Sequence, residues 1–196
     1  MMKTLPTTTF TLLTFLIFAH PLRAAELPEE KPLWPEGQGQ PQAIHYAEGE
    51  TIRENPARST APSGKNRVFS RIAKPTYSIF RPETGQGNGV GVVICPGGGY
   101  TDVWLDREGH DLAIRLKEYG ITSLVLKYRT NTGSLNGKRT FEWKDYLPVV
   151  ISDAHQAITT LRSEAEALNL KPDRIGICGF SAGGHLALSA VLNPPR

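Results

Sequence analysis

The sequence predicts an α/β fold, in which a doubly wound, mostly parallel sheet carries helices on both faces. Three observations support this fold class. Continuous apolar runs such as residues 90–95 are typical of strands that are buried on both sides. Segments with helical periodicity separate these runs, and glycine-rich turns follow them. The order strand, helix, strand, helix, strand, helix implies right-handed crossovers and therefore a parallel sheet.

Four apolar segments predict the strands. Residues 90–95 form a continuous apolar run that the sequence PGGGY closes, which is typical of a strand inside a parallel sheet. One or two shorter strands are expected near residues 68–82, where Pro75 and Pro82 interrupt the pattern. Further strands are expected at residues 121–129 and 174–180.

Three segments predict helices, at residues 106–120, 150–168 and 182–192. Asp106 can cap the first helix and Gly120 can end it. In the second, apolar residues recur at spacings of three and four. A polar loop is expected before it, over residues 130–145.

The chain is expected to begin with a secretory signal peptide at residues 1–24. Lys3 gives a weakly positive start, residues 9–19 are apolar, and Leu22 and Ala24 stand where a signal peptidase would accept them. The apolar stretch is shorter than the ~20 residues that span a bilayer. A buried N-terminal helix is the alternative. A signal peptide predicts a secreted or periplasmic protein.

Charge and length exclude several classes of protein. The 196 residues carry a formal net charge of +3, which falls to +1 when Lys3 and Arg23 leave with the signal peptide. No basic face or acidic tail points to a nucleic-acid partner, and the mature chain has no second apolar segment that could span a membrane. About 170 residues would remain, enough for one domain with one core.

The mature chain divides into an irregular N-terminal arm, residues 25–66, and the N-terminal part of a folded domain, residues 67–196. The arm is rich in Pro, Gly and Glu and shows no period of 2 or 3.6. Trp34 and Tyr46 are its candidate anchors to the domain.

The two cysteines, Cys95 and Cys178, are too few for a disulfide scaffold. Each is expected at the end of an inner strand, where two small buried thiols are favoured over a bond between them. The chain has no CxxC motif and no Cys/His spacing, so no metal site is expected. No organic cofactor site is expected either.

The clearest chemical signal is Gly179-Phe180-Ser181-Ala182-Gly183, which fits the pattern G-x-S-x-G. A serine on so tight a turn has a strained backbone, and its flanking positions must lack bulky side chains. The predicted strand–turn–helix context favours a nucleophilic serine over a plain glycine-rich turn. Ser181 is therefore the candidate catalytic nucleophile.

The second signal is CPGGGY, residues 95–100, directly after a buried strand. Glycines let backbone N–H groups approach a ligand closely. Donors from Gly98 and Gly99, together with that of Ala182, would form an oxyanion hole for the charge that develops in acyl transfer. A phosphate-binding loop is the alternative, but the Gly-Lys-Ser/Thr that grips phosphate is missing.

Residues 90–188 resemble the α/β-hydrolase superfamily, in particular acetyl-xylan-esterase-like and feruloyl-esterase-like serine esterases related to the His-Gly-Gly-Gly lipases. The resemblance is carried by VVICPGGGY, EGHDLAIRLKEYGITSLVLKYR, SDAHQAI and PDRIGICGFSAGGHLA. It implies an α/β-hydrolase sheet and an acyl-enzyme on Ser181. It also implies a substrate-binding role for Tyr100, beside the acyl or sugar pocket.

The acid and base of a catalytic triad are not evident in the sequence. The family order is Ser, then Asp or Glu, then His. After Ser181 the chain has no acidic residue and only His185, one helical turn away, which is expected to pack or to form a hydrogen bond. His45, His110 and His155 are expected to be structural. Helix caps or surface charges are expected of three aspartates: Asp102, Asp106 and Asp153.

The sheet is also expected to be truncated after the helix that follows Ser181, because the sequence supplies five strands at most. We therefore expect the N-terminal fragment of a longer esterase. The strand over residues 174–180 would have an open edge, and Leu186, Leu188 and Val191 would lack part of their packing. The chain alone is expected to aggregate and to turn over poorly.

Three functions are compatible with these observations. The leading one is an exported serine esterase that removes acetyl or other acyl groups from plant-type polysaccharide, so that its partner is a small-molecule or polysaccharide ester. The first alternative is a serine peptidase of the prolyl-oligopeptidase type, which shares the fold. The second is a non-catalytic secreted protein that uses the fold to bind a ligand.

Overall fold

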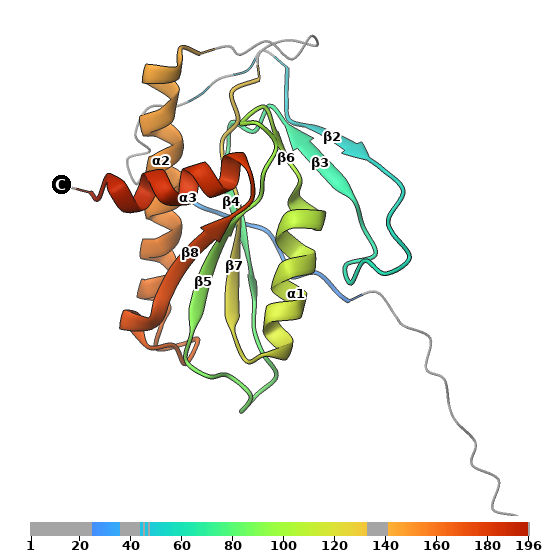
Figure 1. Ribbon diagram of the computed structural model, residues 1–196, viewed down its shortest axis with the longest axis vertical. Helices are drawn as coiled ribbons and strands as arrows, with labels where there is room; N and C mark the ends of the chain where they lie inside the picture. Colours follow the sequence, from blue (N-terminus) through green and yellow to red (C-terminus); the bar gives the residue numbers. More distant parts are fainter. Residues whose placement is uncertain (1–24, 36–43, 45, 47, 133–140, 196) are drawn as a thin grey trace, which may run out of the picture.

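The computed structural model of the chain describes residues 25–35, 44, 46, 48–132 and 141–195. A five-stranded sheet with the strand order β1-β4-β7-β5-β8 forms its centre (Figure 1). Its strands are β1 (Lys31–Pro32), β4 (Thr76–Phe80), β7 (Thr122–Lys127), β5 (Gly91–Cys95) and β8 (Ile175–Gly179). β7, β5 and β8 are parallel, whereas β4 and β1 are antiparallel to their neighbours.

The two central strands are largely buried on both faces, as the sequence predicted for residues 90–95. All six residues of β7 are buried, and Val93 and Ile94 of β5 have no exposed surface. Helices cover both faces and remove these side chains from water, which is why a parallel sheet reads as a continuous apolar run. β8 differs because it lies at the edge of the sheet, and none of its residues is fully buried.

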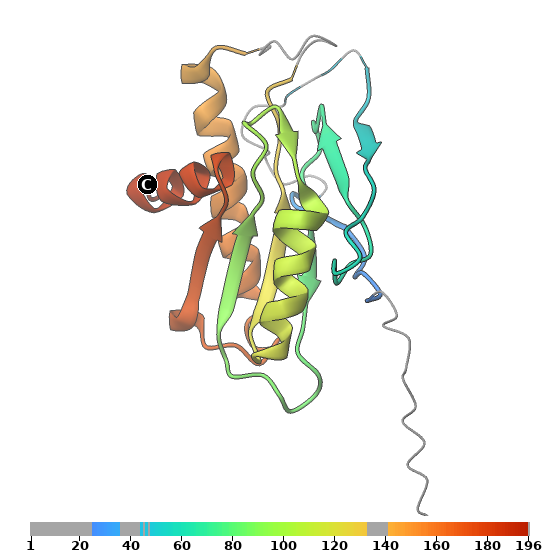
Figure 2. The same ribbon diagram turned by 45° about the vertical axis from the view of Figure 1, so that its right-hand side comes forward.

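The helices lie on both sides of this sheet. They are α1 (Asp111–Glu118), α2 (Trp143–Ser163) and α3 (Ala182–Leu192), with a short 3-10 turn, η2 (Pro172–Arg174), before β8. Figures 1 and 2 show α1 on one face and α2 on the other. α3 packs beside α2, and the Nε2 atom of His155 donates a hydrogen bond of 2.9 Å to the carbonyl oxygen of Ala190.

The helix predicted over residues 106–120 begins differently from expectation. Its first turn is a π-helical turn, η1 (Asp106–His110), and Asp106 makes no cap. The Asp106 carboxylate instead contacts the side chains of Arg67 and His110. A carboxylate engaged by a guanidinium and an imidazole is not available to the backbone N–H groups of its own helix.

The long helix also has other bounds than the sequence indicated. α2 begins at Trp143, inside the segment predicted as a polar loop, and ends at Ser163, before Leu168. The aromatic rings of Trp143 and Tyr146 pack against the ring of Tyr100, which stabilises the first turn. Residues 133–140 of the predicted loop lie outside the described residues.

The N-terminal arm contributes two short strands that its composition did not predict. β1 pairs with β4, and β2 (Thr51–Glu54) pairs with β3 (Arg67–Ser70) in a second sheet that β6 (Asp102–Val103) completes. Pairing with a strand of the domain can order a segment that has no periodicity of its own. The segment predicted as a signal peptide lies outside the described residues.

Trp34 and Tyr46 hold the arm to the domain, as the sequence indicated. The Nε1 atom of Trp34 donates a hydrogen bond of 2.9 Å to the Asp153 carboxylate on α2. The hydroxyl of Tyr46 donates to the carbonyl oxygen of Thr130, just after β7. The arm therefore reaches the carboxyl end of the parallel strands.

The two cysteines are free thiols, although their strands are neighbours. Cys178 of β8 is paired in register with Ile94 of β5, which precedes Cys95. Successive side chains of a strand point to opposite faces, so the two sulfur atoms lie on opposite sides of the sheet. This geometry explains why no disulfide forms between them.

Candidate active site

Ser181 lies in the sharp turn between β8 and α3, where the sequence predicted a nucleophile. Its side chain is exposed, and its backbone has φ 47° and ψ −118°. A non-glycine residue in such a region costs of order 1–3 kcal/mol and persists only where its surroundings hold it. The turn therefore presents the hydroxyl at the carboxyl end of the sheet at a conformational cost.

The glycines around Ser181 are required by close backbone contacts. A Cβ atom on Gly183 would lie 2.0 Å from the carbonyl oxygen of Cys95. A Cβ atom on Gly179 would lie 2.4 Å from the carbonyl carbon of Gly183. These contacts let the start of α3 approach the end of β5, and no side chain would fit between the two backbones.

The glycine loop after β5 lies against the same turn. Phe180 N donates a hydrogen bond of 3.1 Å to the carbonyl oxygen of Cys95, and a Cβ atom on Gly97 would lie 3.2 Å from the Cβ atom of Ser181. The two motifs are far apart in the chain, but β5 and β8 are adjacent strands that end at the same edge. The fold thus brings the two motifs together.

Most polar backbone groups of this loop are used inside the protein. Gly97 N donates to the Glu108 carboxylate at 2.8 Å, and Gly98 O accepts hydrogen bonds from the N–H groups of Thr101 and Asp102. Within the described residues, the N–H groups of Gly98, Gly99 and Ala182 donate no hydrogen bond. These are the three groups that the sequence assigned to an oxyanion hole.

Two of these loop glycines have backbones that other residues avoid. Gly98 has φ 142° and Gly99 has φ 64°. A Cβ atom on Gly98 would also lie 2.0 Å from the carbonyl oxygen of Asp102. The consecutive positive φ angles turn the loop sharply beside Ser181, which only glycine does at low cost.

Tyr100, the predicted substrate-binding residue, is only 4% exposed. Its hydroxyl lies 2.8 Å from Nδ1 of His185, and its ring makes edge contacts with Trp143 and Tyr146. Its buried side chain therefore packs against two more exposed neighbours, Trp143 and His185. His185 forms a hydrogen bond, as the sequence indicated.

No histidine side chain of the described part of the chain forms a hydrogen bond with the Ser181 hydroxyl. His110 is buried and contacts Asp106, and His155 contacts Ala190 on α3. His45 and His20 lie outside the described residues. The described residues thus present the nucleophile and the N–H donors without a base in contact with the serine.

The expectation that three aspartates are caps or surface charges is wrong for two of them. Asp106 and Asp153 have no exposed surface. Asp106 is paired with Arg67 at 2.7 Å, and Asp153 is paired with Arg129. Asp102, which is half-buried, accepts a hydrogen bond from the hydroxyl of Ser70. Each buried carboxylate is matched by a guanidinium, which is the condition under which burial of a charge is tolerated.

The family match agrees with this geometry. Residues 78–194, more than half of the chain, match the family model BD-FAE. The chain belongs to the BD-FAE family. The matched segment runs from β4 through α3, and it contains both glycine motifs and Ser181.

Two relatives of this BD-FAE chain are named for ester hydrolysis. It is 34% identical over 119 residues to an acetylxylan esterase from Xylanibacter ruminicola, a match that covers 61% of this chain and 22% of the relative. The crystal structure of an acetyl ester-xyloside bifunctional hydrolase from Caldicellulosiruptor lactoaceticus is 26% identical with a TM-score of 0.52, and covers 82% of this chain and 45% of that one. The BD-FAE chain thus spans less than half the length of either relative.

A third neighbour shows the fold alone. A sugar hydrolase from Lactococcus lactis has a TM-score of 0.52 at 22% identity, over 66% of this chain and 47% of that one. These neighbours confirm that the BD-FAE chain has the α/β-hydrolase fold and confirm the resemblance to the esterases of that superfamily.

Sequence reasoning missed Glu108, which fixes Gly97 in the BD-FAE chain. Glu108 lies in η1, eleven residues after Gly97, and its carboxylate accepts a hydrogen bond from the Gly97 N–H. Acidic residues at the start of a helix are usually solvated or interact with its dipole, so nothing in the sequence singled it out. Glu108 is the first residue of EGHDLAIRLKEYGITSLVLKYR, one of the stretches that carry the resemblance, and this position is the signal that could have identified it.

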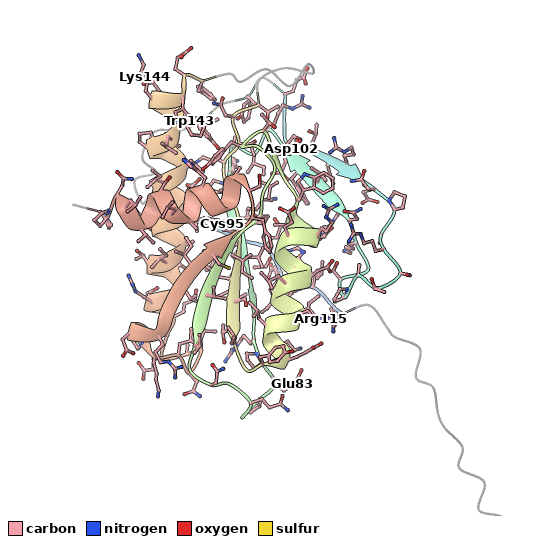
Figure 3. The ribbon with its side chains drawn as sticks, viewed as in Figure 1. Glu83, Cys95, Asp102, Arg115, Trp143 and Lys144 are labelled. Carbon is pink, nitrogen blue, oxygen red and sulfur yellow. The ribbon has the colours of Figure 1, made fainter. Side chains whose placement is uncertain are left out.

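Other features of the described part of the BD-FAE chain are far from Ser181 or have no catalytic groups. A cavity of about 440 Å³ has Glu83 and Asn169 among its lining residues. Figure 3 shows Glu83 at the end of the sheet opposite Trp143 and Asp102. The described residues contain no cluster of three or more His, Cys, Asp or Glu arranged for a metal ion, and no helix that is long and apolar enough to cross a bilayer.

Proposed function

We propose that this protein is an exported serine esterase that removes acetyl or other small acyl groups from plant-type polysaccharide. The observation that carries the proposal is the strained Ser181, which is exposed beside the N–H groups of Gly98, Gly99 and Ala182. The polysaccharide substrate is supported by the relatives named for acetylxylan and acetyl ester-xyloside hydrolysis. Residues 1–24 would direct export.

In the proposed reaction, the Ser181 hydroxyl attacks the ester carbonyl carbon while its proton passes to a general base. The carbonyl oxygen becomes negatively charged and is held by the three N–H groups. The carbon–oxygen bond to the sugar breaks, the leaving sugar oxygen takes the proton from the base and becomes a hydroxyl, and an acyl-enzyme remains on Ser181. A water molecule then gives a proton to the base and attacks the acyl carbonyl carbon, the bond to the Ser181 oxygen breaks, and that oxygen takes the proton back as the acid is released.

The general base and the acid that orients it are proposed to lie in sequence beyond this chain. No described residue fills either role next to Ser181, and the chain spans less than half the length of its relatives. Reading the coding DNA past the Arg196 codon in all three frames tests this. An Asp or Glu followed by a His in the continuing frame would support the proposal, and a stop codon together with the matching native mass would contradict it.

Acetate release from acetylated xylan by the native protein tests the activity and the substrate together. Wild type should release acetate and Ser181→Ala should not. Cleavage of simple aryl esters without release of acetate from xylan would refute the proposed substrate class but would still support esterase activity.

A non-catalytic binding protein is the second candidate, because no base contacts Ser181 in the described residues. A fluorophosphonate probe separates the two candidates, since it labels only an activated serine. Labelling of wild type that is lost in Ser181→Ala supports the esterase, and failure to label the longest native form supports the binding protein. N-terminal sequencing of the native protein tests the proposed export, since a mature chain that begins near Ala25 is expected.

A further inference from the structure

One hydrogen bond joins the glycine loop after β5 to the helix that follows Ser181. The hydroxyl oxygen of Tyr100 lies 2.8 Å from Nδ1 of His185. Tyr100 directly follows Gly98 and Gly99, and His185 is one helical turn beyond Ser181, whose carbonyl oxygen accepts its backbone N–H at 3.0 Å. The bond therefore connects the loop that offers N–H groups with the element that carries the serine.

Tyr100 is held in a conformation that it would not adopt unaided. Its φ is 64°, the third consecutive positive φ after those of Gly98 and Gly99, and it is the only one of the three with a side chain. Contacts on all sides keep it there. Its carbonyl oxygen accepts a hydrogen bond of 2.7 Å from Asn131 N, and its ring packs edge-on against Tyr128, Trp143, Tyr146 and His185.

The other end of the loop is fixed independently. Gly97 N donates to Glu108, and Gly97 O accepts from Trp104 N at 3.0 Å. Only Gly98 and Gly99 lie between these two fixed points. Because glycine has few conformational limits of its own, the direction of their N–H groups depends on where the two ends are held.

We propose that Tyr100 and His185 are positioning residues, whose hydrogen bond locks the Gly97–Tyr100 loop to α3 and aligns the N–H groups of Gly98 and Gly99 with that of Ala182. The structural lock stands by itself, and its catalytic consequence rests on the proposed esterase function. Tyr100 remains a neutral phenol, because burial raises the pKa of its hydroxyl above the ordinary value, with a further rise from Cys95. His185 therefore holds the loop through its hydrogen bond with the Tyr100 hydroxyl.

Hydrogen exchange followed by mass spectrometry tests the lock without any need for activity. The amides to follow are those of Thr101, Asp102 and Trp104, which donate to Gly98 and Gly97. In Tyr100→Phe, which keeps the ring and loses the hydroxyl, they should exchange about tenfold faster than in wild type. Tyr119→Phe, on an exposed tyrosine, is the matched control and should match wild type.

Substitution of His185 provides the second arm and covers the case in which Tyr100→Phe fails to fold. His185→Leu should speed the same exchange about tenfold. His185→Asn should restore most of the protection, because its amide oxygen can accept the Tyr100 hydroxyl near the position of Nδ1. Unchanged exchange in Tyr100→Phe, or equal exchange in the Leu and Asn variants, would overturn the lock.

Steady-state kinetics on an acetyl ester with the native protein test the catalytic consequence. Tyr100→Phe should lower kcat about tenfold and change KM less than twofold, because oxyanion contacts are made mainly in the transition state. His185→Asn should recover most of kcat relative to His185→Leu. An inactive wild type would refute the proposed function and leave the exchange result standing. An active wild type with equal kcat in Tyr100→Phe would refute the catalytic part of the inference.

Discussion

Ser181 combines a reactive position with an unfavourable backbone. Its φ of 47° and ψ of −118° belong to a region that suits glycine, yet a hydroxyl is needed there for attack on an ester. Local strain of this kind is tolerated where surrounding contacts fix it. Here the contacts are backbone to backbone, through Gly179 and Gly183 against the end of β5.

Replacement of Ser181 by glycine should relieve this strain. Relative to Ser181→Ala, we expect Ser181→Gly to raise the free energy of unfolding by about 1 kcal/mol, because the relieved strain exceeds the added entropy of the unfolded chain. Both variants lose the hydroxyl, so the pair isolates the backbone term. Urea denaturation measures the difference, and a glycine variant no more stable than the alanine variant would show that the turn is unstrained.

Gly183 should tolerate no side chain. Gly183→Ala places a Cβ atom 2.0 Å from the carbonyl oxygen of Cys95 and 2.5 Å from that of Pro96, and neither backbone can move without disturbing β5. We expect a loss of about 3 kcal/mol in unfolding free energy. Gly176→Ala on β8 is the control, since nothing lies within 4 Å of its added Cβ atom, and it should be neutral or slightly stabilising.

At the scale of elements, buried ion pairs attach helices and the arm to the sheet. Arg129, just after β7, and Asp153 of α2 are both fully buried, and Trp34 of the arm donates to the same carboxylate. Arg67 of β3 and Asp106 of η1 form a similar pair on the second sheet. Removal of one charge of a buried pair leaves the other charge buried and uncompensated, which destabilises the fold.

Asp153→Asn should therefore be strongly destabilising. The buried guanidinium of Arg129 would lose the Asp153 carboxylate, for which we expect a loss of about 3–5 kcal/mol in the free energy of unfolding. The exposed Asp145 on the same helix provides the control, and Asp145→Asn should change the free energy by less than about 0.5 kcal/mol. Equal effects of the two substitutions in urea denaturation would mean that the pair adds nothing to stability.

Asp106 should make stability depend on acid pH. Burial by itself would raise the pKa of Asp106, but hydrogen bonds from His110 and Arg67 outweigh burial and hold that pKa well below the ordinary range. Its stabilising contribution is therefore complete above about pH 4, the pKa region of an unfolded carboxyl, and is lost as the pH falls from there toward the folded pKa. Unfolding free energies of wild type and Asp106→Asn should converge as the pH is lowered from 5 to 2. A difference in unfolding free energy that stays constant over this range would contradict the assignment. Asp173→Asn, on an exposed carboxylate, is the control, and its unfolding free energy should match that of wild type.

At the scale of the whole molecule, the described surface is least protected at the edge formed by β8 and α3. β8 pairs only with β5 in the described part of the chain. Leu188, Val191 and Leu192 of α3 are 58%, 62% and 69% exposed, and Phe180, directly after β8, is 41% exposed. An open strand edge next to a group of exposed apolar side chains favours association between molecules.

The purified chain should therefore self-associate through this edge. We expect the mass measured by light scattering to rise with concentration, and the double substitution Leu188→Lys with Leu192→Lys to reduce that rise. Ile52→Lys is the control, because Ile52 is similarly exposed at 55% but lies on β2 in the other sheet. A monodisperse monomer at all concentrations, or an equal effect of the control, would exclude this edge as the site of association.

The order of the parallel strands and the helices between them, Ser181 in its turn and the glycine loop could be predicted from the sequence. These features depend on local properties, namely the period of apolar residues and the need for glycine where φ is positive or backbones touch. The parallel sheet followed from the same order, because crossovers are right-handed and strands that are buried on both faces are apolar throughout.

Which polar side chains are buried, and what they contact, became evident only in the folded chain. Trp34 meets Asp153 across 119 positions of the chain, and Tyr100 meets His185 across 85. A carboxylate on a helix reads as a cap or a surface charge until an arginine from another element is seen beside it, as for Asp106 and Asp153. The strands of the arm and the role of Glu108 were hidden for the same reason, since pairing between distant segments leaves no periodic trace in either of them.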